Sequence, residues 1–273
     1  MTIRVAATIM GVLLAVAGPA RAEAPRRVVT VNLCLDQLAL RLAAPGQLVG
    51  VSYLARNPRT SVLADRARDI PIVRAAVESI LDLRPDLVVF DAMAQANVKR
   101  LVRAAGVQIL ELPWAASLEE AEGLIARMAD ALGRSEQGRE LIASMRERQR
   151  QLVRPGPPTA TAGVLQANLR TTGKGSLMDE LLRLTGYRNL ATDLGSSAYG
   201  RFSLEAVLAG QPDLVIFDGE SNVDPARATS FVDHPAIRTL AQHARILSLP
   251  IRYSICAGPE NLDAMQRLRE VHP

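Results

Sequence analysis

The chain has 273 residues, of which 48% are hydrophobic and 22% are charged, with a formal net charge of +4. This composition is ordinary for a globular protein, and the length allows one large domain or two lobes. Without Arg4 and Arg21, the charged residues among the first 22, the charge falls to +2. Such a small charge argues against a nucleic-acid partner, which needs clustered basic residues.

The first 22 residues have the pattern of a secretory signal peptide. Arg4 supplies an early positive charge, an apolar run extends from Val5 to Ala17, and Ala20-Arg21-Ala22 matches a small-residue cleavage site. The run of about 13 residues is too short to span a bilayer. We expect cleavage after Ala22 and a mature protein outside the cytoplasm; an uncleaved anchor is the alternative.

Short apolar runs alternate with amphipathic stretches between residues 27 and 112. Strands are predicted at 27–31, 48–51, 87–90 and 107–112, and helices at 35–42, 77–83 and 97–105. Gly106 is a typical stop for the last of these helices. Continuous apolar strands that alternate with helices predict an α/β fold, with parallel sheets covered on both faces.

The pattern changes between residues 117 and 153, where two helices are separated only by Gly133-Arg134. Ser135 is a good N-cap for the second helix, whose 18 residues would reach about 27 Å. Residues 154–158, Arg-Pro-Gly-Pro-Pro, end the helical stretch and form the clearest boundary in the sequence. The alternation then resumes, with strands predicted at 162–166, 214–217 and 245–249 and helices at 177–184, 204–208 and from 259 onward.

One segment of fifteen residues occurs twice. Residues 77–91 match residues 204–218 without a gap, with eight identical positions that include Pro-Asp-Leu-Val, and residues 35–38 have a weaker echo at 178–181. This period is far too long for a solenoid. We therefore predict two lobes of the same construction, 23–134 and 155–273, joined by a backbone helix at 135–154. The alternative is that a helix, a Pro-Asp turn and a strand are a common local solution.

The reactive residue types do not predict an enzyme, a metal site or a cofactor. Cys34 and Cys256 could form a disulfide outside the cytoplasm or remain free buried thiols. The three histidines, at 234, 243 and 272, have no Cys or carboxylate at ligand spacing, and His234 beside Asp233 looks like a helix start. Common catalytic motifs are missing, and Gly173–Ser176 is interpreted as a turn that ends at a helix N-cap instead of a phosphate loop.

The repeated Pro-Asp-Leu-Val element, the single long helix between its copies, and residues 234–237 and 245–250 resemble the periplasmic binding proteins of ABC importers for cobalamin and ferric siderophores. Residues 32–38, 176–182 and 256–259 are similar to the cobalamin-type subgroup. The resemblance implies a monomeric periplasmic protein of the helical-backbone type. It would capture a bulky metal chelate, with cobalamin or a related corrinoid favoured, and deliver it to an ABC importer permease dimer in the inner membrane. A ferric siderophore or haem is the alternative ligand, and a ligand-sensing subunit is the alternative role.

Glu78 and Glu205 occupy equivalent positions of the repeat, so each lobe is expected to present one of them at its outer end. In the resembled family, carboxylates at these positions meet arginines of the two permease subunits, as charge-assisted pairs. The alternative is that each glutamate only favours the dipole of its short helix.

The ligand site is expected beyond the carboxyl ends of the strands, in a cleft between the lobes. Large planar ligands favour aromatic faces, and basic side chains could meet carboxylate or phosphate groups; packing or solvent exposure is the alternative for each residue. The candidates are Cys34, Tyr53, Met93 and Trp114 in the first lobe, and Arg170, Lys174, Tyr199, Arg252 and Tyr253 in the second.

Overall fold

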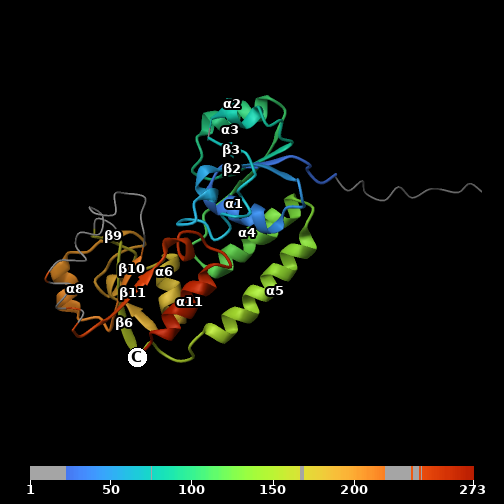
Figure 1. Ribbon diagram of the computed structural model, residues 1–273. Helices are drawn as coiled ribbons and strands as arrows, with labels where there is room; N and C mark the ends of the chain where they lie inside the picture. The colour runs from blue at the N-terminus through green and yellow to red at the C-terminus, as the bar shows by residue number, and fades with distance from the viewer. Residues whose placement is uncertain (1–22, 75, 167–168, 219–234, 236–239, 241) are drawn as a thin grey trace, which may run out of the picture.

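The structure is a computed structural model that describes residues 23–74, 76–166, 169–218, 235, 240 and 242–273. Two lobes lie at an angle to each other, and a pair of helices runs beside them on one side (Figure 1). The predicted signal peptide, Asn168, Asp233 and His234 lie outside the described residues. Within the described part of the chain, no helix is both long enough and apolar enough to cross a membrane.

The N-terminal lobe contains a five-stranded parallel sheet in the order β3-β2-β1-β4-β5. Its strands are β1 (Val28–Thr30), β2 (Leu48–Ser52), β3 (Ile72–Val73), β4 (Leu87–Asp91) and β5 (Gln108–Leu112). Helix α1 (Leu33–Leu42) packs on one face, whereas α2 (Val77–Leu81) and α3 (Ala96–Ala104) cover the other, over Val29, Val88 and Phe90. Burial on both faces explains why the central strands β1 and β4 are almost continuously apolar, whereas the edge strand β5 includes the exposed residues Gln108 and Glu111.

The C-terminal lobe repeats this plan with a four-stranded parallel sheet in the order β11-β10-β6-β8. Its strands are β6 (Ala160–Leu165), β8 (Tyr187–Asn189), β10 (Leu214–Asp218) and β11 (Arg245–Leu249), and its helices are α6 (Leu177–Leu184), α7 (Leu190–Asp193), α8 (Leu204–Gly210) and α11 (Asn261–Glu270). A separate antiparallel pair, β7 (Arg170–Thr171) and β9 (Gly200–Arg201), lies beside the sheet. The α/β fold class is thus confirmed, and the two copies of the repeat form α2–β4 and α8–β10.

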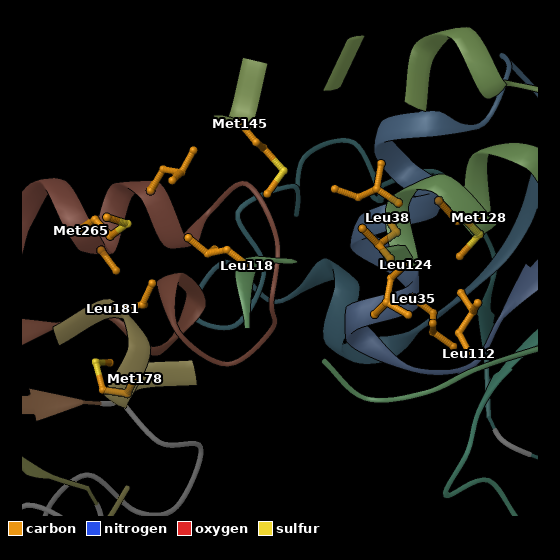
Figure 2. Packing of buried hydrophobic residues seen from close by; sticks show 14 of the residues in the cluster. Leu35, Leu38, Leu112, Leu118, Leu124, Met128, Met145, Met178, Leu181 and Met265 are labelled. Atoms are coloured by element: carbon orange, nitrogen blue, oxygen red, sulfur yellow. The ribbon is translucent and has the colours of Figure 1, made fainter. Parts of the chain in front are cut away.

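The two lobes share one hydrophobic core through α4 (Leu118–Ala131), α5 (Ser135–Leu152) and α11. Leu35, Leu38 and Leu124 extend this core into the N-terminal lobe, and Leu181 and Met265 extend it into the other (Figure 2). Because the apolar contacts are continuous, an independent movement of one lobe would expose core surface to water. The limits 23–134, 135–154 and 155–273 remain proposed domain boundaries.

The start of α5 differs from its prediction. Arg134 is the N-cap, Ser135 is already helical, and no side chain caps the helix. Helix α4 begins as the pattern indicates, because the Ser117 side chain accepts a hydrogen bond from the Glu120 amide at 3.0 Å. The two helices approach each other closely at Gly138, where a Cβ atom would lie 2.5 Å from the Cβ of Ala129. A tight α4–α5 pair therefore supports the backbone between the lobes.

Candidate ligand-binding site

A cavity of about 770 Å³ lies between the lobes, beyond the carboxyl ends of the strands. Its walls come from both lobes: residues after β4 and β5 belong to the N-terminal lobe, and residues after β6, β7 and β11 and before β9 belong to the C-terminal one. The cavity is lined by Ala92, Met93, Trp114, Ala115, Ala116, Gln166, Thr172, Gly175, Ser176, Leu177, Met178, Ala198, Tyr199, Ile251, Ser254 and Ile255. Its volume is at the upper end of the range for small-molecule sites.

A second compartment of about 380 Å³ adjoins the first on the side of the N-terminal lobe. It is lined by Asn32 and Cys34 at the start of α1, by Tyr53 and by Arg74, and it shares Trp114 and Ile255 with the main cavity. The two compartments together form one cleft, with Trp114 and Ile255 common to both walls.

Large apolar side chains stay exposed along this cleft. Tyr53 and Tyr199 are each 64% exposed, Met93 is 79% exposed and Trp114 is 56% exposed. Each of them lines one of the two compartments. Such exposure costs free energy in water, and grouped exposed apolar side chains typically mark a binding surface. The cleft is therefore suited to a ligand with a large apolar or aromatic body.

Among the described residues that line the main cavity, none is charged. Its polar contributions come from uncharged groups such as Gln166, Ser176 and Ser254. The Thr172 side chain belongs to a residue that is only 6% exposed, and its hydroxyl has no hydrogen-bond partner within the described part of the chain. A buried hydroxyl without a partner is unfavourable, so a bound ligand could supply the bond that is missing.

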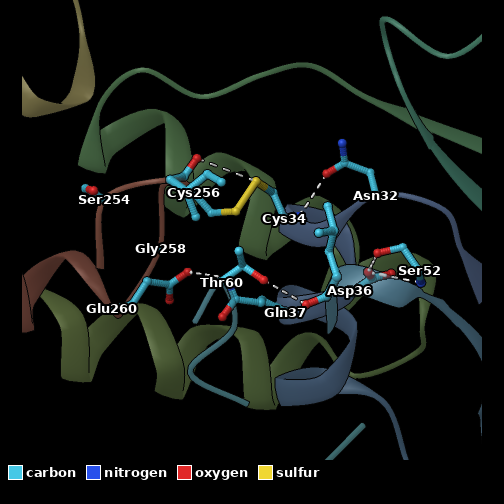
Figure 3. Close-up of a disulfide and its surroundings, with 12 residues drawn as sticks. Asn32, Cys34, Asp36, Gln37, Ser52, Thr60, Ser254, Cys256, Gly258 and Glu260 are labelled. Atoms are coloured by element: carbon cyan, nitrogen blue, oxygen red, sulfur yellow. Dashed lines mark hydrogen bonds between the residues drawn. A yellow bond between two sulfur atoms is a disulfide. The ribbon is translucent and has the colours of Figure 1, made fainter. Parts of the chain in front are cut away.

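A disulfide between Cys34 and Cys256 joins the two lobes at the cleft (Figure 3), with a Cα–Cα distance of 5.3 Å. Cys34 lies in the first turn of α1, where the Asn32 side chain caps the helix by accepting a hydrogen bond from the Cys34 amide at 2.8 Å. Cys256 lies in the loop between β11 and α11, and Ile255 before it lines both compartments. The pairing that the sequence left open is thus a covalent link across the interlobe boundary.

A buried ion pair reinforces this link at the next turn of α1. Glu260 is buried, accepts a hydrogen bond from Arg41 Nη2 at 2.9 Å and accepts another from Gln37 Nε2 at 3.1 Å. Burial raises the pKa of Glu260, and the positive charge of Arg41 opposes that rise. Asn261 holds the other end of the loop by donating hydrogen bonds to the Tyr253 and Cys256 carbonyls. The cleft wall at 251–258 is therefore held from both lobes.

Two buried or half-buried aspartates support loops that line the cleft. Asp36 accepts hydrogen bonds from the Thr30 hydroxyl and from the amide and hydroxyl of Ser52, and burial raises its pKa to about 6. Asp179, at the corresponding position of the weaker repeat, accepts from Asn189 Nδ2 at 3.0 Å and from the Thr192 hydroxyl at 2.7 Å. Each aspartate ties the first turn of a helix to the end of a neighbouring strand, so the loops that line the cleft are preorganised.

Most of the predicted cleft residues lie just after the carboxyl ends of strands, where the ligand site of an open parallel sheet is expected; we call this expectation the strand-end rule. Cys34 and Tyr53 line the smaller compartment, Trp114 lines both, and Met93 and Tyr199 line the main cavity. Arg170 lines an adjoining hollow that shares Tyr199. Lys174 is exposed beside Gly175, but it lines none of these spaces.

The prediction for Arg252 and Tyr253 does not agree with the structure, because both line a separate hollow with Pro58, Asp65 and Asp263. Arg252 Nη1 donates to the Pro58 carbonyl at 2.9 Å. The Tyr253 ring has the guanidinium carbons of Arg252 and Arg267 each 5.0 Å from its centroid. The hydrogen bond from Arg252 lowers the pKa of Tyr253. These contacts are cation–π packing and loop anchoring.

The sequence reasoning missed Ile251, Ser254 and Ile255, which form the wall nearest the disulfide. They follow Pro250, directly after strand β11, so the strand-end rule could have included them. It stopped at the charged and aromatic residues Arg252 and Tyr253, which a turn of 3-10 helix (Ile251–Tyr253) directs elsewhere. A short irregular turn has no periodicity from which the direction of a side chain can be predicted.

Two similar α/β lobes around a preformed, largely apolar cleft define a solute-binding protein of the two-lobed class. The chain matches the family described as "Periplasmic binding protein" over residues 28–247. It belongs to this family, whose members bind solutes outside the cytoplasm and are not enzymes.

Two relatives support this membership. The chain is 22% identical to the uncharacterized ABC transporter substrate-binding lipoprotein YvrC of Bacillus subtilis, over 90% of this chain and 79% of that protein. It is 24% identical to a cobalamin-binding protein of Halobacterium salinarum, over 76% of this chain and 58% of that protein.

Solved structures show the same fold. The apo form of the periplasmic heme-binding protein RhuT from Roseiflexus sp. RS-1 has a TM-score of 0.72 at 24% identity. The match covers 90% of this chain and 98% of the RhuT chain. A periplasmic heme-binding protein from Pseudomonas aeruginosa has a TM-score of 0.70 at 26% identity, with 90% and 91% coverage. The vitamin B12 binding protein BtuF of Vibrio cholerae has a TM-score of 0.70 at 19% identity, with 90% and 96% coverage.

Proposed function

We propose that this protein captures a bulky metal chelate in the cleft, with cobalamin or a related corrinoid favoured, and delivers it to an ABC importer. The observation that carries this proposal is the main cavity of about 770 Å³, which combines exposed apolar side chains with an uncharged lining among the described residues. A corrin ring is large and rigid, and its periphery carries mainly neutral amides. Uncharged donors and acceptors such as Gln166, Ser176 and Thr172 suit those amides, and Trp114 and Tyr199 suit the ring.

Haem is the second candidate, and a specific observation favours it. Arg170 and Arg201 line a hollow that shares Tyr199 with the main cavity. Haem carries two carboxylates, which pair well with guanidinium groups. The solved structures with this fold include proteins named for haem binding and for vitamin B12 binding. The choice between these ligands therefore depends on direct binding measurements.

Calorimetric titration of the purified protein with cobalamin, haem and a ferric siderophore tests the proposal. Tight one-to-one binding of cobalamin is expected, with quenching of the fluorescence of Trp114, the single tryptophan of the chain. Binding of haem or a siderophore alone would keep the transport class and overturn the favoured ligand. Binding of none of the three would overturn cobalamin, haem and that siderophore as the cargo and leave only the two-lobed architecture standing.

Replacement of Ile255 tests whether the cleft is the site. The change Ile255→Asp places a carboxylate in a wall common to both compartments. We expect this change to lower the ligand affinity by about 10-fold or more, because the carboxylate would lose its hydration against an apolar ligand. Leu101→Asp is the matched control, since Leu101 lies on α3, is 42% exposed and does not line the cleft. Equal effects of the two changes would argue against this cleft.

Glu78 and Glu205 are the proposed docking residues for the permease. Each is exposed at the second position of its short helix, and α2 and α8 lie at the outer ends of the two lobes, far from α5 (Figure 1). We expect Glu78→Lys with Glu205→Lys to abolish transporter-dependent uptake while ligand binding is kept. Glu140→Lys, on the exposed face of α5, is the control. Uptake that survives the double change would overturn these two glutamates as the docking residues, whereas a wild type that binds ligand but supports no uptake would favour a ligand-sensing role.

We further propose that the chain is exported, cleaved after Ala22 and functions as a monomer. The signal-like pattern of the first 22 residues supports export. N-terminal sequencing of the protein from the periplasm tests the cleavage point, and light scattering of the same sample tests the monomer.

A further inference from the structure

We infer that Arg170 and Arg201 form an anion subsite at the rim of the cleft, which receives an acidic group carried on the periphery of the bound chelate. The inference rests on the proposed function and deepens it, because it adds a charged recognition element to a cavity whose described lining is otherwise neutral. The acidic group is an oxyanion, either a phosphodiester or a carboxylate.

The two arginines are brought together by the antiparallel pair β7–β9. Arg170 is the register partner of Arg201, and both side chains are exposed. Directly opposite residues of an antiparallel pair lie about 5 Å apart at Cβ on the same face, so one anion can contact both guanidinium groups. It also gains charge-assisted hydrogen bonds, which can be bidentate at each arginine.

The hollow beside this pair adjoins the main cavity at Tyr199. It measures about 540 Å³, is lined by Arg170, Tyr199, Gly200 and Arg201, and shares Tyr199 with the main cavity. Tyr199 is 64% exposed, so no packed core separates the two spaces. A ligand whose ring lies against Trp114 and Tyr199 can therefore extend a side arm to the arginines without moving the backbone.

Unsatisfied hydrogen-bonding groups adjoin the arginines on the same segment. Thr171 and Thr172 are buried, and within the described residues neither hydroxyl has a hydrogen-bond partner. Thr172 also lines the main cavity. Buried polar groups are normally paired, so unpaired ones are expected where a ligand completes the bonds. Segment 170–172 therefore supplies a charged group at the rim and a hydroxyl at the wall.

The subsite is also held in place before a ligand arrives. Gly173 and Lys174 donate backbone hydrogen bonds to the Ser197 and Ser196 carbonyls, each at 3.0 Å. A Cβ atom on Gly173 would lie 2.3 Å from the Ser196 carbonyl oxygen, so only glycine permits this approach. At the other end, the Phe202 amide donates to the Leu169 carbonyl at 2.8 Å. The two arginine-bearing strands are thus clamped on both sides, which lowers the ordering cost of binding.

A pair of ligands that differ in one acidic group tests the inference. Cobalamin carries a phosphodiester in its nucleotide arm, whereas cobinamide has the corrin ring without that arm. The wild type, the double variant Arg170→Gln/Arg201→Gln and the control Arg269→Gln, which removes an exposed arginine from α11, are titrated with both ligands at low and high salt. We expect the double variant to lose about 10- to 100-fold in affinity for cobalamin. Cobinamide binding and the Arg269 variant are expected to be unchanged.

Salt and a charge-retaining variant separate this role from a structural one. The affinity of the wild type for cobalamin should fall with ionic strength, and that dependence should disappear in the double variant. Arg170→Lys/Arg201→Lys keeps both charges without the planar fork and should give an intermediate affinity. Melting curves of each variant confirm that the fold is kept, and the lysine variant alone is decisive if the glutamine variant does not fold.

The outcomes distinguish the subsite from the cargo. If the wild type binds haem instead of a corrinoid, haem and its uncharged dimethyl ester replace the two corrinoids, and a loss for haem alone supports a carboxylate as the anion. Unchanged cobalamin binding in the double variant, or equal losses for the charged and uncharged ligands, overturns the subsite and leaves the cleft standing. A wild-type protein that binds none of these ligands overturns the proposed cargo and the subsite together.

Discussion

Asp86 and Asp213, the aspartates of the two Pro-Asp elements, make the same pair of backbone hydrogen bonds in the two lobes. The Asp86 amide donates to the Arg27 carbonyl at 2.9 Å, and Asp86 Oδ1 accepts from the Arg27 amide at 2.9 Å. The Asp213 amide donates to the Thr161 carbonyl at 2.9 Å, and Asp213 Oδ2 accepts from the Thr161 amide at 2.8 Å. The repeat in the sequence is therefore a repeat of one structural device, which joins the start of a central strand to its neighbour.

Loss of either carboxylate should weaken this device. We expect Asp86→Ala and Asp213→Ala each to lower the free energy of unfolding by about 1 kcal/mol, because a strand-starting amide loses its acceptor. Urea denaturation measures the change. Asp65→Ala is the control, since the Asp65 side chain is 91% exposed and its salt bridge within the described residues is to the likewise solvent-facing Arg68; a change within about 0.5 kcal/mol is expected there. An Asp86 variant as stable as the control would show that the shared geometry does not contribute to stability.

The interlobe disulfide should contribute to both stability and binding. A disulfide that closes a loop with a sequence separation of 222 residues restricts the unfolded chain strongly. We expect Cys34→Ser/Cys256→Ser to lower the free energy of unfolding by about 2–4 kcal/mol. The wall at 251–258 would then be held to α1 by Glu260 and its partners alone, so ligand affinity should fall as well. Denaturation and titration with and without a reductant measure both effects, and reduced wild type should match the variant. Identical oxidised and reduced behaviour would contradict a role for the bond.

Asp36 should make stability depend on pH. Its pKa is about 6 in the folded protein against 3.8 for an ordinary aspartate. Between these values the unfolded chain releases its proton while the folded chain keeps it. The contribution of Asp36 to stability is therefore fully present below pH 3.8 and is lost as the pH rises through 6. That loss amounts to about 3 kcal/mol.

The variant Asp36→Asn isolates this effect, because it cannot ionise and can still accept hydrogen bonds from Ser52. The stability of the wild type minus that of the variant should decrease by about 2 kcal/mol between pH 4 and pH 7, because part of the total loss falls below pH 4. Glu260, whose pKa burial also raises, is present in both proteins, so its contribution cancels. Denaturation series across this pH range provide the measurement. A difference that stays constant with pH would mean that Asp36 ionises normally in the folded state.

Two helical glycines should respond in opposite ways to alanine. At Gly138 on α5, a new Cβ would lie 2.5 Å from the Cβ of Ala129 on α4, so the helices must separate. We expect a loss of about 1–3 kcal/mol from overpacking. At Gly123 on α4 nothing lies within 4 Å of the added atom, and the better helix propensity of alanine should stabilise the protein by about 0.5–1 kcal/mol. Thermal denaturation compares the two variants. A stabilising Gly138→Ala would contradict close packing of α4 on α5.

Much of the cleft could be predicted from the sequence, for a reason that Trp114 and Tyr53 illustrate. Each comes shortly after a predicted strand, and the carboxyl ends of parallel strands meet at one edge of a sheet. Once the strands were recognised, these residues had to lie near the interlobe space. Arg201 lies in a segment, 197–202, that was expected to line the site, but it was not singled out and its pairing with Arg170 was not predicted, because β7 and β9 contain two residues each and so short a strand has no periodicity.

Local pattern and the internal repeat by themselves determined the α/β class, the two lobes and the equivalence of α2–β4 with α8–β10. The reason is that strands buried on both faces are apolar at almost every position, whereas helices buried on one face are apolar only at every third or fourth. Only the tertiary structure decided that Cys34 is bonded to Cys256 and that Glu260 is paired with Arg41. It also decided that Arg170 lies opposite Arg201, whereas Arg252 is turned away from the cleft. These are contacts between segments far apart in the chain, whose partners depend on how whole lobes pack and not on the residues next to them.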